Sequence, residues 1–158
     1  MIVYIACDHA GLDLKLKVIN ALPEIQWKDM GTHDGDSVDY PDYANKVCQE
    51  LVKVELQNKK SGIQDSLQGP ALGVLICGSG QGMAIRANRF RQIRAALCWN
   101  EDIARLSREH NNANILALSA RFSSPESAIK MIQTFLKTPF EGGRHQKRVD
   151  KLSTDTGC

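Results

Sequence analysis

The feature that most constrains the fold of this chain is an alternation of short apolar runs with segments of helical periodicity. The run "IVYIA" at residues 2–6 has the composition of a β-strand, and leucines at helical spacing follow it up to Pro23. The same pair of patterns recurs in "IQW" before 41–54, "LGVLI" before 83–88, "AALCW" before 101–109 and "NILAL" before 125–136. About five β–α units in a chain of 158 residues predict a single α/β domain.

The predicted strands are apolar along their whole length, which indicates burial on both faces and hence a parallel sheet with helices on either side. We therefore expect a three-layer α/β/α sandwich with a five-stranded parallel sheet, of the Rossmann-like kind, over residues 1–158. Residues 55–70 are polar with Gly and Pro, and they predict a surface loop between units. Residues 139–158 predict a C-terminal arm, in which Gly142 and Gly143 precede a short basic helix.

Charge and cysteine content exclude several classes of protein. The chain has 20 basic and 18 acidic side chains, so no overall attraction to nucleic acid or to a membrane is implied. Residues 1–20 mix charged with apolar positions, as neither a signal peptide nor a membrane span does. The five cysteines lack the C-x-x-C spacing of a zinc site or redox motif, and their odd number argues against a disulfide framework. We expect a cytoplasmic protein with reduced thiols and no cysteine zinc site.

Chemically useful residues follow the predicted strands. The exits are Cys7-Asp8-His9, Gly31-Thr32, Cys77-Gly78-Ser79-Gly80, Trp99-Asn100 and Ser119-Ala120-Arg121. Ligands of open parallel sheets bind beyond these carboxyl ends. The glycines of "CGSGQG", at residues 77–82, allow a sharp turn and a close backbone approach to an anion. The pattern matches neither the Walker sequence nor the dinucleotide fingerprint, and a tight turn without a ligand is the plain alternative.

Three further positions are candidates for chemistry. Cys77 ends its strand where backbone amides and a helix N-terminus favour the thiolate, which can act as a base or a nucleophile. His110 and Asn111 close the fourth predicted helix, where an imidazole can equally be only a C-terminal cap. Arg144 and Arg148 are spaced i and i+4, so a helix would aim both guanidinium groups at one phosphate. A solvated basic tail is the alternative for this pair.

Five segments of the chain resemble one known family. They are "ACDHAGLDLK", "DYPDYA", "GVLICGSGQGMAIRANR", "LSREHNNANILALSAR" and "FEGGRHQKRVDKL", in order from residue 2 to about residue 152. Together they resemble ribose-5-phosphate isomerases of type B, in the family shared with the isomerases of galactose 6-phosphate and allose 6-phosphate. The chain departs from this pattern in the polar stretch 55–70 and in Ser79, where many members carry threonine.

The resemblance implies an aldose–ketose isomerase that interconverts ribose 5-phosphate and ribulose 5-phosphate through a cis-enediolate, without metal or cofactor. It implies Cys77 as the base and His110 as the acid–base group that opens the sugar ring. The amides of the glycine loop, at Gly78, Gly80 and Gly82, would stabilise the enediolate oxygen together with Ser79. The remaining implied contacts are Asp8 and Asn111 to sugar hydroxyls, Tyr43 lining the site, and His9, Arg121, Arg144 and Arg148 to the phosphate.

The resemblance also implies a homodimer, sometimes paired into tetramers, whose sites use both chains and whose C-terminal segment reaches the partner. Relatives without the cysteine use a glutamate four positions later, where this chain has Gln81, so the chain falls into the cysteine branch. Three alternatives remain open at this point. They are an isomerase of a 6-phosphate sugar, a non-catalytic phosphosugar- or nucleotide-binding module, and a thiol-redox enzyme with a resolving cysteine such as Cys7 near Cys77.

Overall fold

The computed structural model describes residues 2–60 and 71–154, and its centre is a five-stranded parallel sheet. The strands are β1 (Ile2–Cys7), β2 (Gln26–Asp29), β3 (Leu72–Cys77), β4 (Ala95–Leu97) and β5 (Ile115–Ser119), in the spatial order β2-β1-β3-β5-β4. The helices are α1 (Leu12–Ala21), α2 (Tyr40–Lys60), α3 (Gln81–Ala87), α4 (Glu101–Asn111), α5 (Pro125–Lys137) and α6 (Gln146–Leu152). Short 3₁₀ turns at His9–Gly11 and Gly143–His145 precede α1 and α6.

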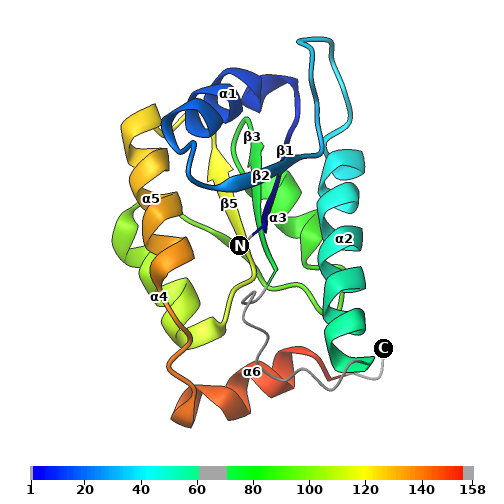
Figure 1. The fold of residues 1–158 in the computed structure, drawn as a ribbon, viewed down its shortest axis with the longest axis vertical. Coiled ribbons are helices and arrows are strands. Elements are labelled where there is room, and N and C mark those ends of the chain that lie inside the picture. Colours follow the sequence, from blue (N-terminus) through cyan, green and yellow to red (C-terminus); the bar gives the residue numbers. More distant parts are fainter. Residues whose placement is uncertain (1, 61–70, 155–158) are drawn as a thin grey trace.

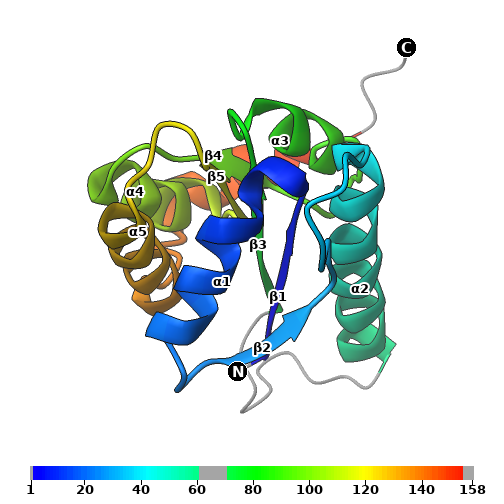
Figure 2. The same cartoon turned by 90° about the horizontal axis from the view of Figure 1, so that it is seen from above.

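Helices cover both faces of the sheet, as Figures 1 and 2 show, so the predicted three-layer sandwich is confirmed. Successive side chains of a strand point to opposite faces, and each face has its own apolar core. Val3, Ile5 and Cys7 of β1 pack in the layer of α1, α4 and α5, whereas Tyr4 and Ala6 pack in the layer of α2 and α3. By the same alternation, the Cys77 side chain belongs to the layer of α2 and α3.

The prediction of a surface loop over residues 55–70 is wrong in its first part. Helix α2 continues to Lys60, so residues 55–60 are helical. The segment "ELQNKK" contains neither Gly nor Pro and consists mostly of good helix formers, and the first helix-breaking residue after it is Gly62. Polarity alone therefore misidentified the last turns of a solvated helix. Residues 61–70, the rest of that prediction, lie outside the described residues.

The topology fixes where a ligand can bind. From β1 the chain moves to β2 on one side, whereas β3 lies on the other side of β1, so the strand order reverses between β1 and β3. In open parallel sheets the crevice beyond such a reversal is the usual binding site. The exits of β1 and β3 carry Asp8 and Cys77. This is the position in which the sequence predicted the site.

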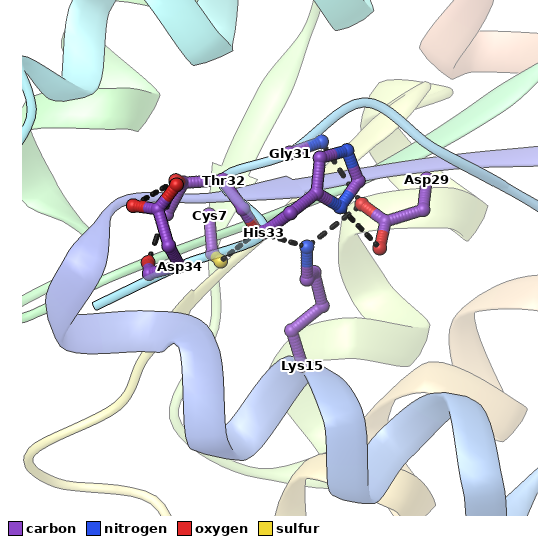
Figure 3. Close-up of polar contacts among 7 residues, drawn as sticks. All are labelled: Cys7, Lys15, Asp29, Gly31, Thr32, His33 and Asp34. Atoms are coloured by element: carbon purple, nitrogen blue, oxygen red, sulfur yellow. Dashed lines mark hydrogen bonds and ion pairs between the residues drawn. The ribbon is translucent and has the colours of Figure 1, made fainter. Parts of the chain in front are cut away.

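A buried lysine joins the exit of β2 to helix α1. Lys15 is fully buried, and its Nζ lies 2.8 Å from Asp29 Oδ1 and donates to the Thr32 carbonyl at 2.5 Å. Figure 3 shows this ammonium group between the two oxygens, with the Cys7 thiol on the far side of Thr32. The amide of Gly31 donates to the same Asp29 oxygen at 2.9 Å. Lys15 therefore fixes the turn that follows β2.

Replacing Lys15 by methionine is expected to lower the free energy of unfolding by about 3 kcal/mol, because it leaves a half-buried carboxylate and a buried carbonyl without their donor. Lys17→Met on the same helix is the matched control, since its ion pair with Asp13 at 2.7 Å is exposed. That control should cost less than about 1 kcal/mol. Urea unfolding of both variants measures the difference, and equal losses would show that the buried pair does not stabilise the fold.

Candidate active site

The glycine loop after β3 supplies a backbone donor to the Cys77 thiol. The amide of Gly80 donates to Cys77 Sγ at 3.2 Å. Gly80 has a φ of +76°, a left-handed conformation that favours glycine and that turns the chain from β3 into α3. Gly82 lies in the first turn of α3, and the ring of Tyr40 packs against it. Ser79 is exposed at the tip of the loop, where its hydroxyl accepts from the Gln81 amide at 3.4 Å.

Cys77 is the cysteine with the surroundings of a base. The described cysteines are all free, namely Cys7, Cys48, Cys77 and Cys98, and Cys158 lies outside the described residues. Burial raises the pKa of Cys7 and Cys98 to about 11 and that of Cys48 to about 12. These three thiols stay protonated at neutral pH. Cys7 also faces the opposite layer of the sheet from Cys77, which removes it as the resolving cysteine of a redox pair.

Asp8 and His9 leave β1 beside this loop. Asp8 is nearly buried, and its Oδ1 accepts from the Gly11 amide at 3.1 Å, so the carboxylate is held as the cap of the following 3₁₀ turn. His9 is exposed, and its Nδ1 accepts from the Val38 amide at 3.3 Å. A neutral imidazole that accepts at Nδ1 carries its proton on Nε2, where it can donate to an anion. Tyr43 of α2 lies beside the Gly31 turn.

Arg121 brings a cation to the same edge. Its amide donates to the Gly78 carbonyl at 3.1 Å. Its guanidinium group lies over Gly78, since a methyl group on that residue would be 3.2 Å from Arg121 Nε. The exits of β1, β3 and β5 thus gather Asp8, His9, Cys77 with its glycine loop, and Arg121 at the carboxyl edge of the sheet, as the sequence predicted.

The other predicted residues lie at the opposite edge of the same chain. Helix α4 begins after β4 and ends before β5, so His110 and Asn111 lie at the amino ends of the strands. The five residues of β5 span ~16 Å, which is the scale of the separation between the two edges. Helix α6, with Arg144 just before it and Arg148 within it, also lies beyond the amino ends of the strands (Figure 1). One chain therefore does not bring Cys77 and His110 together.

His110 stacks on His145, a residue that the sequence interpretation left without a role. The two ring centroids are 4.3 Å apart and the rings are nearly parallel, with an angle of 8°. Asn112, in a left-handed conformation, ends α4, so His110 is not the helix cap. Burial, with smaller contributions from His110 and Arg144, lowers the pKa of His145 and favours its neutral form. Its position between two arginines in "GGRHQKR" is the signal that could have pointed to it.

The same cluster contains residue types that bind metal ions. Ligand atoms of His110, Glu141 and His145 lie within 4.8 Å of one another, and imidazole and carboxylate groups are the usual zinc ligands beside thiolates. Arg144 Nε, however, donates to His145 Nε2 at 3.4 Å, and a cation bound there would have to displace this guanidinium group. The arrangement therefore fits a pair of stacked imidazoles better than a metal centre. That the protein needs no metal stays a prediction.

Comparisons with known proteins identify the family of the chain. The family model described as Ribose/Galactose Isomerase matches residues 3–152. The probable ribose-5-phosphate isomerase B of Mycoplasma pneumoniae is 42% identical, with 95% of this chain and 91% of that protein covered. The ribose-5-phosphate isomerase B of Escherichia coli is 36% identical, with 93% and 91% covered.

Solved structures give the same result. A ribose 5-phosphate isomerase of Thermotoga maritima matches with a TM-score of 0.85 and 47% identity over 96% of this chain and 97% of that one. The ribose-5-phosphate isomerase B of Mycoplasma genitalium, solved with bound ribulose-5-phosphate, matches with a TM-score of 0.84 and 39% identity over 96% and 93%. No helix among the described residues is long and apolar enough to cross a membrane. The chain belongs to the ribose/galactose isomerase family.

Proposed function

We propose that this protein interconverts ribose 5-phosphate and ribulose 5-phosphate by moving a proton between C2 and C1 of the open-chain sugar. The observation that carries the proposal is the Cys77 thiol at the β1/β3 reversal, which receives a hydrogen bond from the Gly80 amide at 3.2 Å. The named activity of the relatives, and the ribulose-5-phosphate bound to the Mycoplasma genitalium enzyme, support the choice of substrate.

Each group at the carboxyl edge has a task in this reaction. The Cys77 thiolate removes the proton from C2 and the resulting thiol returns it to C1, while the hydroxyl proton of O2 moves to O1, so no atom or electron is gained or lost overall. The Gly80 amide stabilises the thiolate before the first transfer and after the second. Negative charge that develops on the enediolate oxygen is met by loop amides. Asp8 holds a sugar hydroxyl, and His9 and Arg121 donate to the phosphate.

The residues at the amino edge complete the site from a second copy of the chain. His110 opens the sugar ring, Asn111 holds a hydroxyl, and Arg144 and Arg148 bind the phosphate. Since these groups lie at the far edge of their own sheet, they reach Cys77 only if two chains pack edge to edge. The exposed apolar side chains Trp99 and Phe122, at 67% and 84% exposure, follow β4 and β5 at the carboxyl edge. A partner that covers them accounts for their exposure here, and we infer a homodimer. Pairing of dimers into tetramers and a cytoplasmic location stay predictions.

Replacing Cys77 by alanine is expected to reduce isomerisation of ribose 5-phosphate by at least about a thousandfold, because the base is lost while the fold keeps its shape. Cys48→Ala is the matched control, since Cys48 is a buried thiol of the same layer whose raised pKa keeps it protonated. Turnover with ribose 5-phosphate, allose 6-phosphate and galactose 6-phosphate should be measured side by side for each protein. Near-normal turnover by Cys77→Ala would reject this base. A preference for a 6-phosphate sugar would replace the proposed substrate but not the reaction.

Mixing weakly active Arg148→Ala protein with inactive Cys77→Ala protein is expected to restore up to about a quarter of wild-type activity. Half of the randomly exchanged dimers are hybrids, and each hybrid has one site with both Cys77 and Arg148. Arg148→Ala alone should lower kcat/KM about thirtyfold, equivalent to about 2 kcal/mol for one charge-assisted contact. Cys77→Ala mixed with Asp8→Ala is the control that should not recover, because both residues belong to the same edge. Absence of recovery, with subunit exchange shown separately, would place Arg148 in the site of its own chain.

A further inference from the structure

Residues at the exit of β5 donate hydrogen bonds to the carbonyl groups of the glycine loop. The Cys77 carbonyl accepts from the Ala120 amide at 2.9 Å. The next carbonyl along the chain, that of Gly78, accepts twice, from the Arg121 amide at 3.1 Å and from the Ser119 hydroxyl at 2.7 Å. Two successive carbonyl groups therefore point toward β5. In a regular strand, successive carbonyl groups point in opposite directions. In this loop the two peptide planes instead have the same orientation.

This orientation determines where the amides of the loop point. Both peptide bonds are trans, and in a trans peptide the N–H group points opposite to the carbonyl. The amides of Gly78 and Ser79 therefore point away from β5, toward the crevice beyond β1 and β3. Neither amide donates to any of the described residues. Two adjacent N–H groups that face the same way form a concave site for negative oxygen.

The Ser119 side chain fixes the orientation of the Gly78–Ser79 peptide plane. Its hydroxyl donates to the Gly78 carbonyl and accepts from the Phe122 amide at 3.2 Å, so both its donor and an acceptor position are used. The side chain is nearly buried, and water competes little for these bonds. The Gly78–Ser79 peptide needs this restraint, because glycine at position 78 leaves the backbone more rotational freedom than any other residue would. Arg121 supplies the second restraint through its own amide.

We propose that Ser119 is a positioning residue for the isomerisation: its hydroxyl fixes the Gly78–Ser79 peptide so that the Ser79 amide faces the enediolate oxygen. The inference rests on the proposed function, since it concerns the charge that develops in that reaction. Ser119 does not contact the sugar. It acts only through the peptide that it holds, and the amide serves as a preorganised donor.

Ser119→Ala is expected to lower kcat about tenfold and to change KM less than twofold. Loss of a whole anion-hole donor costs about a hundredfold or more, and here the Arg121 amide still restrains the plane. Affinity for a planar hydroxamate analogue of the enediolate should fall by about the same factor as kcat. Affinity for inorganic phosphate should not change, because the phosphate donors are not altered. Ser119→Thr, which keeps the hydroxyl, should recover most of the lost kcat.

Ser107→Ala is the matched control for a buried hydroxyl. Ser107 is as buried as Ser119, and its hydroxyl donates to the Ala104 carbonyl at 2.8 Å within α4, away from the glycine loop. This variant should keep kcat and the hydroxamate affinity of the wild type. If Ser119→Ala behaves like Ser107→Ala, or loses kcat without losing hydroxamate affinity, Ser119 does not position the amide. A Ser119→Ala protein that does not fold, together with a Ser119→Gly protein that does not fold, would assign the hydroxyl to folding and equally overturn the proposal.

The amide resonance of Ser79 separates failure of this inference from failure of the proposed function. In spectra of ¹⁵N-labelled protein, Ser119→Ala should shift or broaden this resonance, whereas Ser107→Ala should leave it unchanged. The measurement needs no turnover. A wild-type protein inactive on all three sugar phosphates would reject the proposed function, and an unchanged Ser79 resonance in Ser119→Ala would reject the positioning role.

Discussion

Pairing of β3 with its two neighbours is the interaction on which both the fold and the site depend. All six residues of β3 are buried, and the strand pairs with β1 on one side and β5 on the other. The hydrogen bonds continue past the strand ends. The Ile76 carbonyl accepts from the Asp8 amide at 3.2 Å, and the Cys77 carbonyl accepts from the Ala120 amide at 2.9 Å. The backbone hydrogen bonds between β3 and the segments after β1 and β5 therefore also position the carboxylate, the thiol and the loop amides relative to one another.

The direction of the chain also imposes a division. Each helix that follows a strand returns from the carboxyl edge of the sheet to the amino edge, so a residue at the end of such a helix cannot lie in the crevice that residues at the strand ends form. Cys77 and Arg121 are on one edge, and His110 and Arg148 are on the other. A short helix such as α4, with 11 residues, covers ~16 Å. The need for a second chain in the proposed site follows from this polarity.

The sequence predicted those features of the fold and the site that depend on local residue patterns. The β–α alternation predicted the order of elements, and the residues after each strand predicted the contents of the carboxyl edge, because parallel strands end at one edge. It predicted the end of α2 poorly, since a polar helix and a polar loop have similar composition. Lys15 was not recognised at all, and Ser119 was named only as part of a strand exit, without a role. Their roles depend on partners 14 and 41 positions away in the chain, and those partners meet only through the register of the sheet.

The amino edge behaves as one unit because a buried arginine ties its parts together. Arg108 is 4% exposed, and it donates to the Thr138 carbonyl at 3.2 Å, to Asn112 Oδ1 at 3.0 Å and to the Ala113 carbonyl at 2.5 Å. These contacts join the end of α4, the start of β5 and the end of α5. Burial and the nearby Arg94 lower the pKa of Arg108 to about 10, and its guanidinium group still stays charged at neutral pH.

The C-terminal arm begins from this anchored point. The Glu141 amide donates to the Glu109 carbonyl at 3.1 Å, and two residues of the arm, His145 and Val149, are buried. The stack of His145 on His110 then fixes the imidazole relative to the arm that carries Arg144. In the proposed site assembled from two chains, His110 and the arginines of the arm therefore arrive together, with their spacing already set by their own chain. In this proposal the partner supplies the thiol, the loop amides, Asp8 and the remaining phosphate contacts.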